Sequence, residues 1–341
     1  MDEGPAPAAG PPGDRVAALI GGAVGGSVRA IARLISMIES GGDAAAGVAA
    51  GLLGRPRGAT VLGITGPPGV GKSTLITALI GRYRSRAARV AVLAVDPSSP
   101  FSGGALLGDR VRMNEHGTDP GVFIRSMSSR GELGGLSTAT AGAADLLSAI
   151  GFDVVIVETV GVGQNEVAVL RLADTVLVVL SPGLGDGIQA AKAGILEIAD
   201  VLVVNKADRE GVATTVRDLK SMVALGRSGA ADAGRWRIPV LTTVAVDRAT
   251  DPDGAERAGI DRLLDAVDTH RQHLDRHEGA DARAVRRAEA AVEALVLQRL
   301  QAALHAPAGR ESLARAATEV AAGGADTHTA ADRVLRGLIG G

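Results

Sequence analysis

Residues 63–74 read GITGPPGVGKST, and this stretch decides the fold. Gly66 to Ser73 matches the pattern G-x-x-x-x-G-K-[ST], between a β-branched run and a helical stretch. In such a loop, glycines let backbone N–H groups turn inward around phosphate oxygens, and the helix N-terminus adds a favourable partial charge. Lys72 reaches the β- and γ-phosphates, and the Ser73 hydroxyl is placed to ligate Mg²⁺. The alternative is an ordinary glycine-rich turn, which the strand, the lysine and the hydroxyl together disfavour.

Short β-branched runs recur along the chain, with helical stretches between most of them. They cover residues 60–65, 89–95, 121–127, 153–159, 175–181, 201–206 and 238–246. Several are apolar on both faces, as buried parallel strands are. The alternation predicts an α/β fold, a P-loop NTPase with a mostly parallel, doubly wound sheet.

The remaining segments define the domain organisation that we expect. Residues 1–13 form a disordered tail, 14–56 an N-terminal helical segment, 57–278 the P-loop domain and 279–341 a C-terminal helical extension. Apolar residues recur at helical spacing from Arg15 to Ser40 and again from Val285 to Leu295, and Pro307 ends the second stretch before two shorter helices.

Composition excludes several classes of protein. The chain has 341 residues, of which 46% are hydrophobic and 1% aromatic, so its core consists of aliphatic side chains. The net charge of −2 argues against a dedicated nucleic-acid binder. The absence of cysteine excludes disulfides and thiolate metal sites. We find neither a signal peptide nor an apolar run of about 18 residues, so we expect a cytoplasmic protein with no membrane partner.

A second motif, Asn205-Lys206-x-Asp208, closes a late apolar run. An aspartate here can accept hydrogen bonds from guanine N1–H and from the 2-amino group. Adenine lacks these donors and would leave the carboxylate badly paired. Lys206 can lie over the plane of the base. Behind a phosphate loop, the motif predicts that the site holds GTP or GDP, with Mg²⁺.

Acidic residues end two of the predicted strands. Glu158 stands where a carboxylate usually contacts Mg²⁺ through water, and Gly161 can offer its N–H to the γ-phosphate. The alternative for Glu158 is a helix or turn cap. Asp96 ends a strand and Asp109 lies beside a glycine in a loop. Either could approach Mg²⁺ or the attacking water, but both also sit in common turn sequences, and the residues alone leave the choice open.

Several long segments together resemble one family of GTPases. These are GITGPPGVGKST, AVDPSS with LGDRVRM, FIRSMSSRGELGGLS, VVIVETVGVGQNE, PGLGDGIQAAKAGILEIAD and VNKAD. They resemble the MeaB/ArgK family, the methylmalonyl-CoA mutase-associated GTPases, from about Arg15 to the C-terminus. This family belongs to the metallochaperone GTPases that include urease and hydrogenase maturation factors.

The resemblance implies site residues by position. It implies a third switch loop at residues 182–193. The residues implied in catalysis are Lys72, Asp96, Asp109, Arg112, Glu158, Gln189 and Lys192. Those implied in GTP binding are Gly66, Pro68, Gly69, Val70, Gly71, Lys72, Ser73, Thr74, Gly161, Asn205, Lys206, Asp208 and Ala245. Those implied at Mg²⁺ are Ser73, Asp96, Asp109 and Glu158.

Two loops depart from the family pattern. The family's switch loop usually reads Asp-Glu-Leu-Gln-Gly-Ile-Lys-Lys, whereas residues 186–193 read DGIQAAKA and lack the glutamate and the second lysine. The late guanine loop usually reads Ser-Ala, whereas this chain has Val244-Ala245. The N–H of Ala245 can still reach the guanine carbonyl, but a hydroxyl is lost.

The resemblance implies a GTPase, slow alone and stimulated by a partner, that gates adenosylcobalamin loading into an acyl-CoA mutase and protects it. Methylmalonyl-CoA mutase is the default partner, and the cobalamin is expected on the partner. A homodimer through the C-terminal extension is also expected. A metal-delivery GTPase is the alternative, but the chain lacks cysteines and its histidines are scattered. A kinase or transport ATPase is a third hypothesis, which the guanine motif disfavours.

His270, His273 and His277 share one helical face, at spacings of three and four residues. A metal site is conceivable there, but no carboxylate–histidine cluster completes a coordination sphere. We therefore expect a solvated helix surface beside Arg271 and Arg276.

Overall fold

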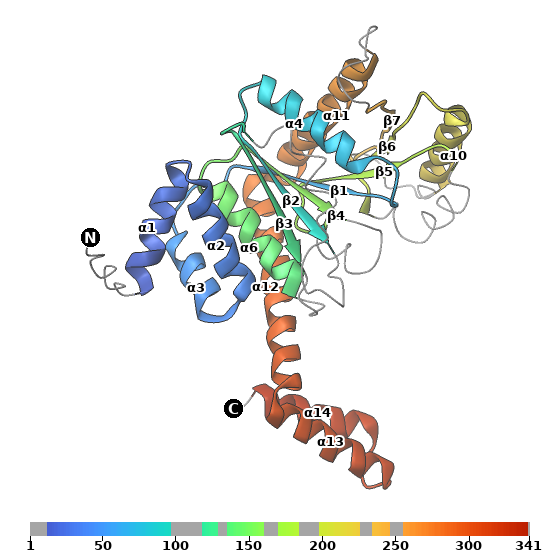
Figure 1. The fold of residues 1–341 in the computed structure, drawn as a ribbon. Helices are drawn as coiled ribbons and strands as arrows, with labels where there is room; N and C mark the ends of the chain where they lie inside the picture. The colour runs from blue at the N-terminus through green and yellow to red at the C-terminus, as the bar shows by residue number, and fades with distance from the viewer. Residues whose placement is uncertain are drawn as a thin grey trace, which may run out of the picture.

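The computed structural model describes residues 12–96, 118–128, 135–159, 170–183, 198–225, 234–245 and 255–339. Within these residues a seven-stranded sheet has the order β3-β2-β4-β1-β5-β6-β7, and every neighbouring pair is parallel (Figure 1). The strands are β1 (Thr60–Thr65), β2 (Val90–Asp96), β3 (Val122–Ser128), β4 (Val154–Thr159), β5 (Thr175–Leu180), β6 (Val201–Val204) and β7 (Val240–Thr242). The helices are α1 (Pro12–Val24), α2 (Val28–Ser40), α3 (Gly42–Gly51), α4 (Lys72–Ser85), α6 (Gly135–Ala149), α10 (Val212–Leu225), α11 (Ala255–His277), α12 (Gly279–His305), α13 (Pro307–Ala321) and α14 (Thr327–Ile339).

This architecture confirms the predicted α/β fold, and each predicted β-branched run overlaps a strand, with β2 and β3 ending one residue later than predicted. The last run is the least regular, because only Val240–Thr242 pairs with the sheet. The chain adds β2, β3 and β4 on one side of β1 and then β5, β6 and β7 on the other. Ligands bind outside the carboxyl ends of the strands at such a reversal, so this topology points to the carboxyl end of β1.

Helices cover both faces of the sheet. On one face, apolar side chains of α4 and α11 pack on alternate residues of the strands, among them Leu62 and Ile64 of β1. On the other face, α2 and α6 pack on the intervening residues, such as Val155 and Val157 of β4 (Figure 1). Near β5 and β6, α10 completes this second face. Burial on both sides explains why the strand sequences are continuously apolar.

The N-terminal segment contains a break that the helical spacing did not predict. Gly26 has φ +87°, a left-handed conformation that glycine adopts without strain. Ser27 then caps the next helix, because its Oγ accepts a hydrogen bond from the N–H of Ala30 over 3.3 Å. The expected continuous stretch is therefore the two packed helices α1 and α2.

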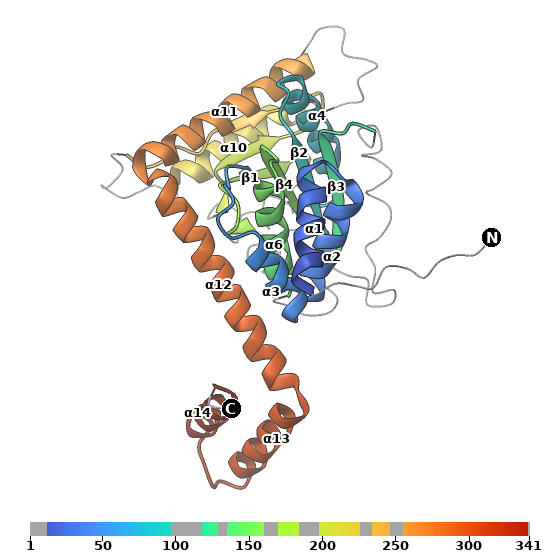
Figure 2. The ribbon, with the colours of Figure 1, turned by 90° about the vertical axis from the view of Figure 1, so that its left-hand side faces the viewer.

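The C-terminal helices extend away from the sheet. Figure 2 shows α12 leaving the body and ending in the α13–α14 hairpin. Pro307 ends α12 and begins α13, as expected of a residue that fits the first helical turn. The apolar side chains of Val292, Val296 and Leu297 on α12 are at least half exposed. None of the described helices is both long enough and apolar enough to span a bilayer.

Candidate functional site

The phosphate-loop motif lies between β1 and α4, at the carboxyl edge of the sheet. Three of its glycines have positive φ, namely Gly66 (+149°), Gly69 (+79°) and Gly71 (+90°). At Gly66 a Cβ atom would lie 2.1 Å from the carbonyl oxygen of Val179 on β5, so only glycine fits there. Gly71 directly precedes α4, whose N-terminus therefore opens at the loop. The backbone has the form that an anion site at a helix N-terminus requires.

Lys72 is buried and turns back over the loop. Its Nζ donates to the carbonyl oxygens of Gly66 over 2.8 Å and Pro67 over 3.1 Å. Such bonds hold the ammonium group inside the curve of the loop, where a phosphate oxygen could accept from it. Pro68 and Thr74 of the same motif are exposed, whereas Val70 is buried in the core beside α4.

Ser73 and Glu158 meet beside the loop. The Ser73 hydroxyl donates to Glu158 Oε1 over 3.3 Å, and Glu158 is buried. Glu158 pairs in register with Ile64, close to the end of β1, which explains why this carboxylate reaches the first turn of α4. A hydroxyl and a carboxylate side by side are oxygen ligands of the kind Mg²⁺ prefers, so the residues present fit this ion.

Asn205 joins three segments at this edge. It is fully buried, and its Nδ2 donates to the carbonyl oxygen of Val70 over 2.9 Å. Its Oδ1 accepts from the N–H of Ala245 and from the hydroxyl of Thr243, each over 3.1 Å. A Cβ atom on Gly71 would lie 2.6 Å from Asn205 Nδ2, so the last loop glycine leaves room for this contact. The phosphate loop and both parts of the predicted guanine reader are therefore one connected unit.

Lys206 and Asp208 complete this unit. Lys206 has φ +57°, which is uncommon for a residue with a side chain, and its Nζ donates to the carbonyl oxygen of Gly69 over 2.6 Å. Asp208 is exposed, so a ligand can reach its carboxylate. Thr243 was not predicted as a site residue, because a threonine inside the β-branched run 238–246 looks like part of the strand.

The remaining predicted site residues divide into two groups. Asp96 is the last residue of β2 and therefore lies at the carboxyl edge. Outside the described residues lie Asp109, Arg112, Gly161, Gln189 and Lys192. Their roles stay predictions.

The expectation of a solvated surface is wrong for His270. Its side chain is only 2% exposed, and Nδ1 lies 2.9 Å from the Thr175 hydroxyl at the amino edge of the sheet. Nε2 lies 3.4 Å from Asp200 Oδ1, and the Trp236 ring packs at 4.6 Å. The cause is that His270 follows Val267 by three residues on the apolar face of α11. The three-residue spacing from Val267 could have predicted from the sequence that His270 is buried.

Burial sets the charge states at this amino edge. It lowers the pKa of His270 to about 4, with nearby positive groups adding to the effect. It raises the pKa of Asp200 to about 6, against the hydrogen bond that Asp200 accepts from Val176. Among the residues that the structure describes, no three His, Asp or Glu side chains are grouped so as to hold a metal ion.

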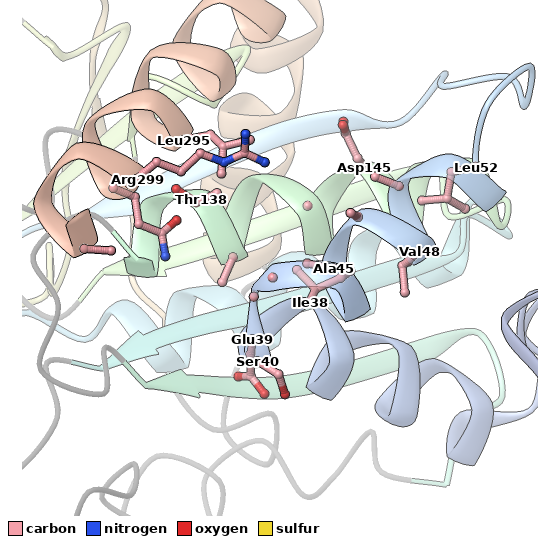
Figure 3. A pocket seen from close by; sticks show the side chains of 18 of the residues that line it. Ile38, Glu39, Ser40, Ala45, Val48, Leu52, Thr138, Asp145, Leu295 and Arg299 are labelled. Carbon is pink, nitrogen blue, oxygen red and sulfur yellow. The ribbon is translucent and has the colours of Figure 1, made fainter. Parts of the chain in front are cut away.

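A separate cavity of about 540 Å³ lies between the N-terminal helices, α6 and α12 (Figure 3). Small and aliphatic side chains dominate its lining, with the Arg57–Asp145 ion pair, 3.0 Å long, at one side. It shares no residue with the phosphate loop or with the Asn205 motif. The cavity is therefore distinct from the candidate site.

Comparisons with known proteins agree with this geometry. The sequence profile of the family described as "Methylmalonyl Co-A mutase-associated GTPase MeaB" matches residues 31–308. A Pyrococcus abyssi protein that is named as a GTPase is 45% identical over 283 residues. The match covers 83% of this chain and 84% of the Pyrococcus protein. The GTPase ArgK of Escherichia coli is 40% identical over 209 residues, 60% of each chain.

A solved structure shares the fold over nearly the whole chain. The crystal structure of a LAO/AO transport system kinase has a TM-score of 0.67 and 25% sequence identity, and the match covers 94% of this chain and 96% of that chain.

Proposed function

The chain belongs to the MeaB family of methylmalonyl-CoA mutase-associated GTPases, and from this we propose that it is a GTP-hydrolysing chaperone of a cobalamin-dependent acyl-CoA mutase. In this proposal the nucleotide state gates the loading of adenosylcobalamin, which the mutase holds, and protects the mutase from inactive cofactor. Methylmalonyl-CoA mutase is the partner that the family description favours.

The observation that carries the nucleotide part of the proposal is the position of Asn205. Its amide binds the phosphate loop at Val70 and the N–H of Ala245 in the late loop. Guanine and phosphate recognition are thereby held at a fixed separation, as a single nucleotide requires. The Asp208 carboxylate is exposed beside this unit, where it can accept from guanine N1–H and the 2-amino group.

The chain's residues divide the work of hydrolysis among them. Backbone N–H groups of the loop from Gly66 to Gly71 and the N-terminus of α4 bind the phosphates. Lys72 exchanges its two carbonyl partners for β- and γ-phosphate oxygens. Ser73 and Glu158 would hold Mg²⁺, with Asp96 and Asp109 approaching it. When bound, the ion would supply positive charge that offsets the negative charge of the phosphate groups.

We propose that turnover is slow in the isolated chain and rises with the mutase. Partner binding would order Arg112 or Lys192 near the phosphates, or position the attacking water. Hydrolysis would then release loops that the γ-phosphate held, which gives the two-state switch that a loading checkpoint needs. The exposed apolar side chains of α12 support a further part of the proposal, a homodimer through the C-terminal helices. We also propose a cytoplasmic location.

The test is GTP hydrolysis by the full chain, alone and with an adenosylcobalamin-dependent acyl-CoA mutase from the same source. We expect a low basal rate, clear stimulation by the mutase, and neither effect with ATP. The Lys72→Ala variant with the mutase controls for contaminating GTPases. Lys192→Ala should lose more of the stimulated rate than of the basal rate.

Hydrolysis of GTP that no mutase changes would contradict the chaperone proposal and leave the GTPase standing. The metal-delivery hypothesis would then be examined by titrating the chain with Ni²⁺ and Zn²⁺.

A further inference from the structure

Two buried threonine hydroxyls meet where β1 and β4 reach the candidate site. Thr159 Oγ1 donates to Thr65 Oγ1 over 2.9 Å, and both residues are fully buried. Thr65 is the last residue of β1, directly before Gly66 of the phosphate loop. Thr159 is the last residue of β4, directly after Glu158. Each hydroxyl is thus one residue away from a group that the proposed site uses.

The hydroxyl bond lies beyond the backbone pairing of these two strands. Their ladder runs from Thr60↔Val154 to Ile64↔Glu158. One residue further on, Thr65 pairs with Val178 of β5 and Thr159 pairs with Val95 of β2. At this point each strand goes on pairing only with its other neighbour, and the hydroxyl bond joins β1 and β4 one residue beyond the end of their own ladder.

The pair lies on the face of the sheet that does not carry the phosphate-loop helix. Ile64 belongs to the cluster packed against α4, and its register partner Glu158 reaches Ser73 on the same side. Because side chains alternate along a strand, Thr65 and Thr159 point to the opposite face. Neither side chain faces Ser73 or the phosphate-loop helix, so an effect of this pair on the Mg²⁺ side of the site would pass through the strand ends.

We propose that Thr65, through its hydroxyl bond to Thr159, is a positioning residue that fixes Glu158 relative to Ser73 and the phosphate loop. The inference rests on the proposed function, because it concerns the Mg²⁺ side of the same site. Loss of the bond frees the end of β4 to move away from β1, and the Ser73–Glu158 pair then opens. The phosphate loop keeps its bonds to Lys72 and Asn205, so the phosphate and guanine contacts are kept.

This role predicts a defect confined to Mg²⁺-dependent binding. Thr65→Val keeps the shape of the side chain and removes the hydroxyl. We expect the Mg²⁺-dependent gain in GDP affinity to fall roughly fivefold, the effect of about one net hydrogen bond. The dissociation constant of GDP in EDTA should stay within about twofold of wild type, because the loop and the Asn205 unit are unchanged.

The experiment is calorimetric titration of the full chain with GDP, in excess Mg²⁺ and in EDTA. Thr65→Ser should restore the wild-type gain, because it returns the hydroxyl. Thr159→Val should also lower the gain, and the double variant should lose less than the sum of the two single losses, because both changes remove the same bond.

Thr60→Val is the matched control. It makes the same change at the other end of β1, where the buried Thr60 hydroxyl accepts from Arg271 over 3.2 Å. We expect it to change thermal stability and to leave the Mg²⁺-dependent gain untouched. A fivefold loss in this variant too would overturn the proposal, since the effect would then belong to the strand in general.

Other results would also overturn it. Equal weakening of GDP with and without Mg²⁺ in Thr65→Val, or failure of Thr65→Ser to restore the gain, would exclude a positioning role. A wild-type affinity that Mg²⁺ does not change would overturn this inference and leave the guanine site standing. A wild-type chain that binds no guanine nucleotide would remove the proposed function and this inference together.

Discussion

At the carboxyl edge of the sheet, Lys72 and Lys206 donate to backbone carbonyls of the phosphate loop, whereas at the amino edge Asp174 and His270 bind groups on other elements of the fold. Asp174 Oδ2 accepts from the N–H of Val61 over 2.8 Å, and its Oδ1 accepts from Arg287 on α12. Buried polar side chains therefore serve different purposes at the two edges.

The two edges differ in how readily a buried polar side chain can exchange its hydrogen-bond partners. A lysine that bonds to loop carbonyls can exchange them for phosphate oxygens, because the carbonyls can turn to other donors. A carboxylate that joins a strand to α12 has no substitute, because its removal leaves a buried N–H and a guanidinium without an acceptor. We infer that the polar side chains at the carboxyl edge bind a ligand and that those at the amino edge hold the C-terminal helices on the sheet.

The largest effect is expected on catalysis at the carboxyl edge. Lys72→Ala should slow GTP hydrolysis at least ~100-fold, because it removes the cation aimed at the phosphates. The free energy of unfolding should stay within about 1 kcal/mol of wild type, as measured by urea denaturation. Lys220→Ala, an exposed lysine on α10, is the control and should change neither quantity. A Lys72→Ala protein that hydrolyses GTP at the wild-type rate would contradict a ligand-binding role for this lysine.

An intermediate effect is expected on stability at the amino edge. Asp174→Asn turns an acceptor into a donor that faces either Val61 or Arg287, and it should lower the free energy of unfolding by about 2 kcal/mol. GDP affinity should be unchanged, because this residue lies at the opposite edge. Glu311→Gln breaks the exposed ion pair with Arg315 on α13 and should cost less than about 1 kcal/mol. Loss of nucleotide binding in Asp174→Asn would show that the amino edge also supports the nucleotide site at the carboxyl edge.

The smallest effect concerns pH. Unfolded histidine takes up a proton near pH 6.5, whereas the pKa of His270 is about 4, so acidification through this window favours unfolding. Asp200 acts in the opposite sense, since its pKa of about 6 exceeds the ordinary value of 3.8 and the folded state binds the extra proton. We expect these contributions largely to cancel between pH 6 and pH 4 in urea titrations of wild type.

Asp200→Asn should remove the compensation, so that the variant loses more stability than wild type between pH 6.5, the ordinary pKa of histidine, and the pKa of about 4 of His270. NMR titration of the His270 ring provides the direct check. A midpoint near 6.5 would show that burial does not hold this imidazole neutral.

Local motifs explain how much of the site could be predicted. Gly66, Lys72 and Asn205 belong to short motifs that can be recognised from adjacent residues alone. The structure has Gly66 and Asn205 directly after strands and Lys72 at the start of α4, as the motifs predict. The hydroxyls of Thr65, Thr159 and Thr243 could not be assigned, because their partners are on other strands or loops and depend on register. His270 was misassigned because a polar residue was given more weight than its place on the apolar face of α11.

The break between α1 and α2 is a feature of the fold that the apolar pattern of the sequence did not predict. Apolar spacing continues through Gly25 and Gly26, so periodicity alone predicted one stretch, whereas the left-handed Gly26 and the Ser27 cap divide it. Local backbone conformation decided this point against the apolar pattern.

The central claim is that the carboxyl edge binds a guanine nucleotide. Its most direct test is calorimetric titration of the wild-type chain with GDP and with ADP, both in the presence of Mg²⁺. We expect GDP to bind at least ~100-fold more tightly than ADP, because adenine leaves the Asp208 carboxylate badly paired. Equal affinity for the two nucleotides, or tighter binding of ADP, would contradict it.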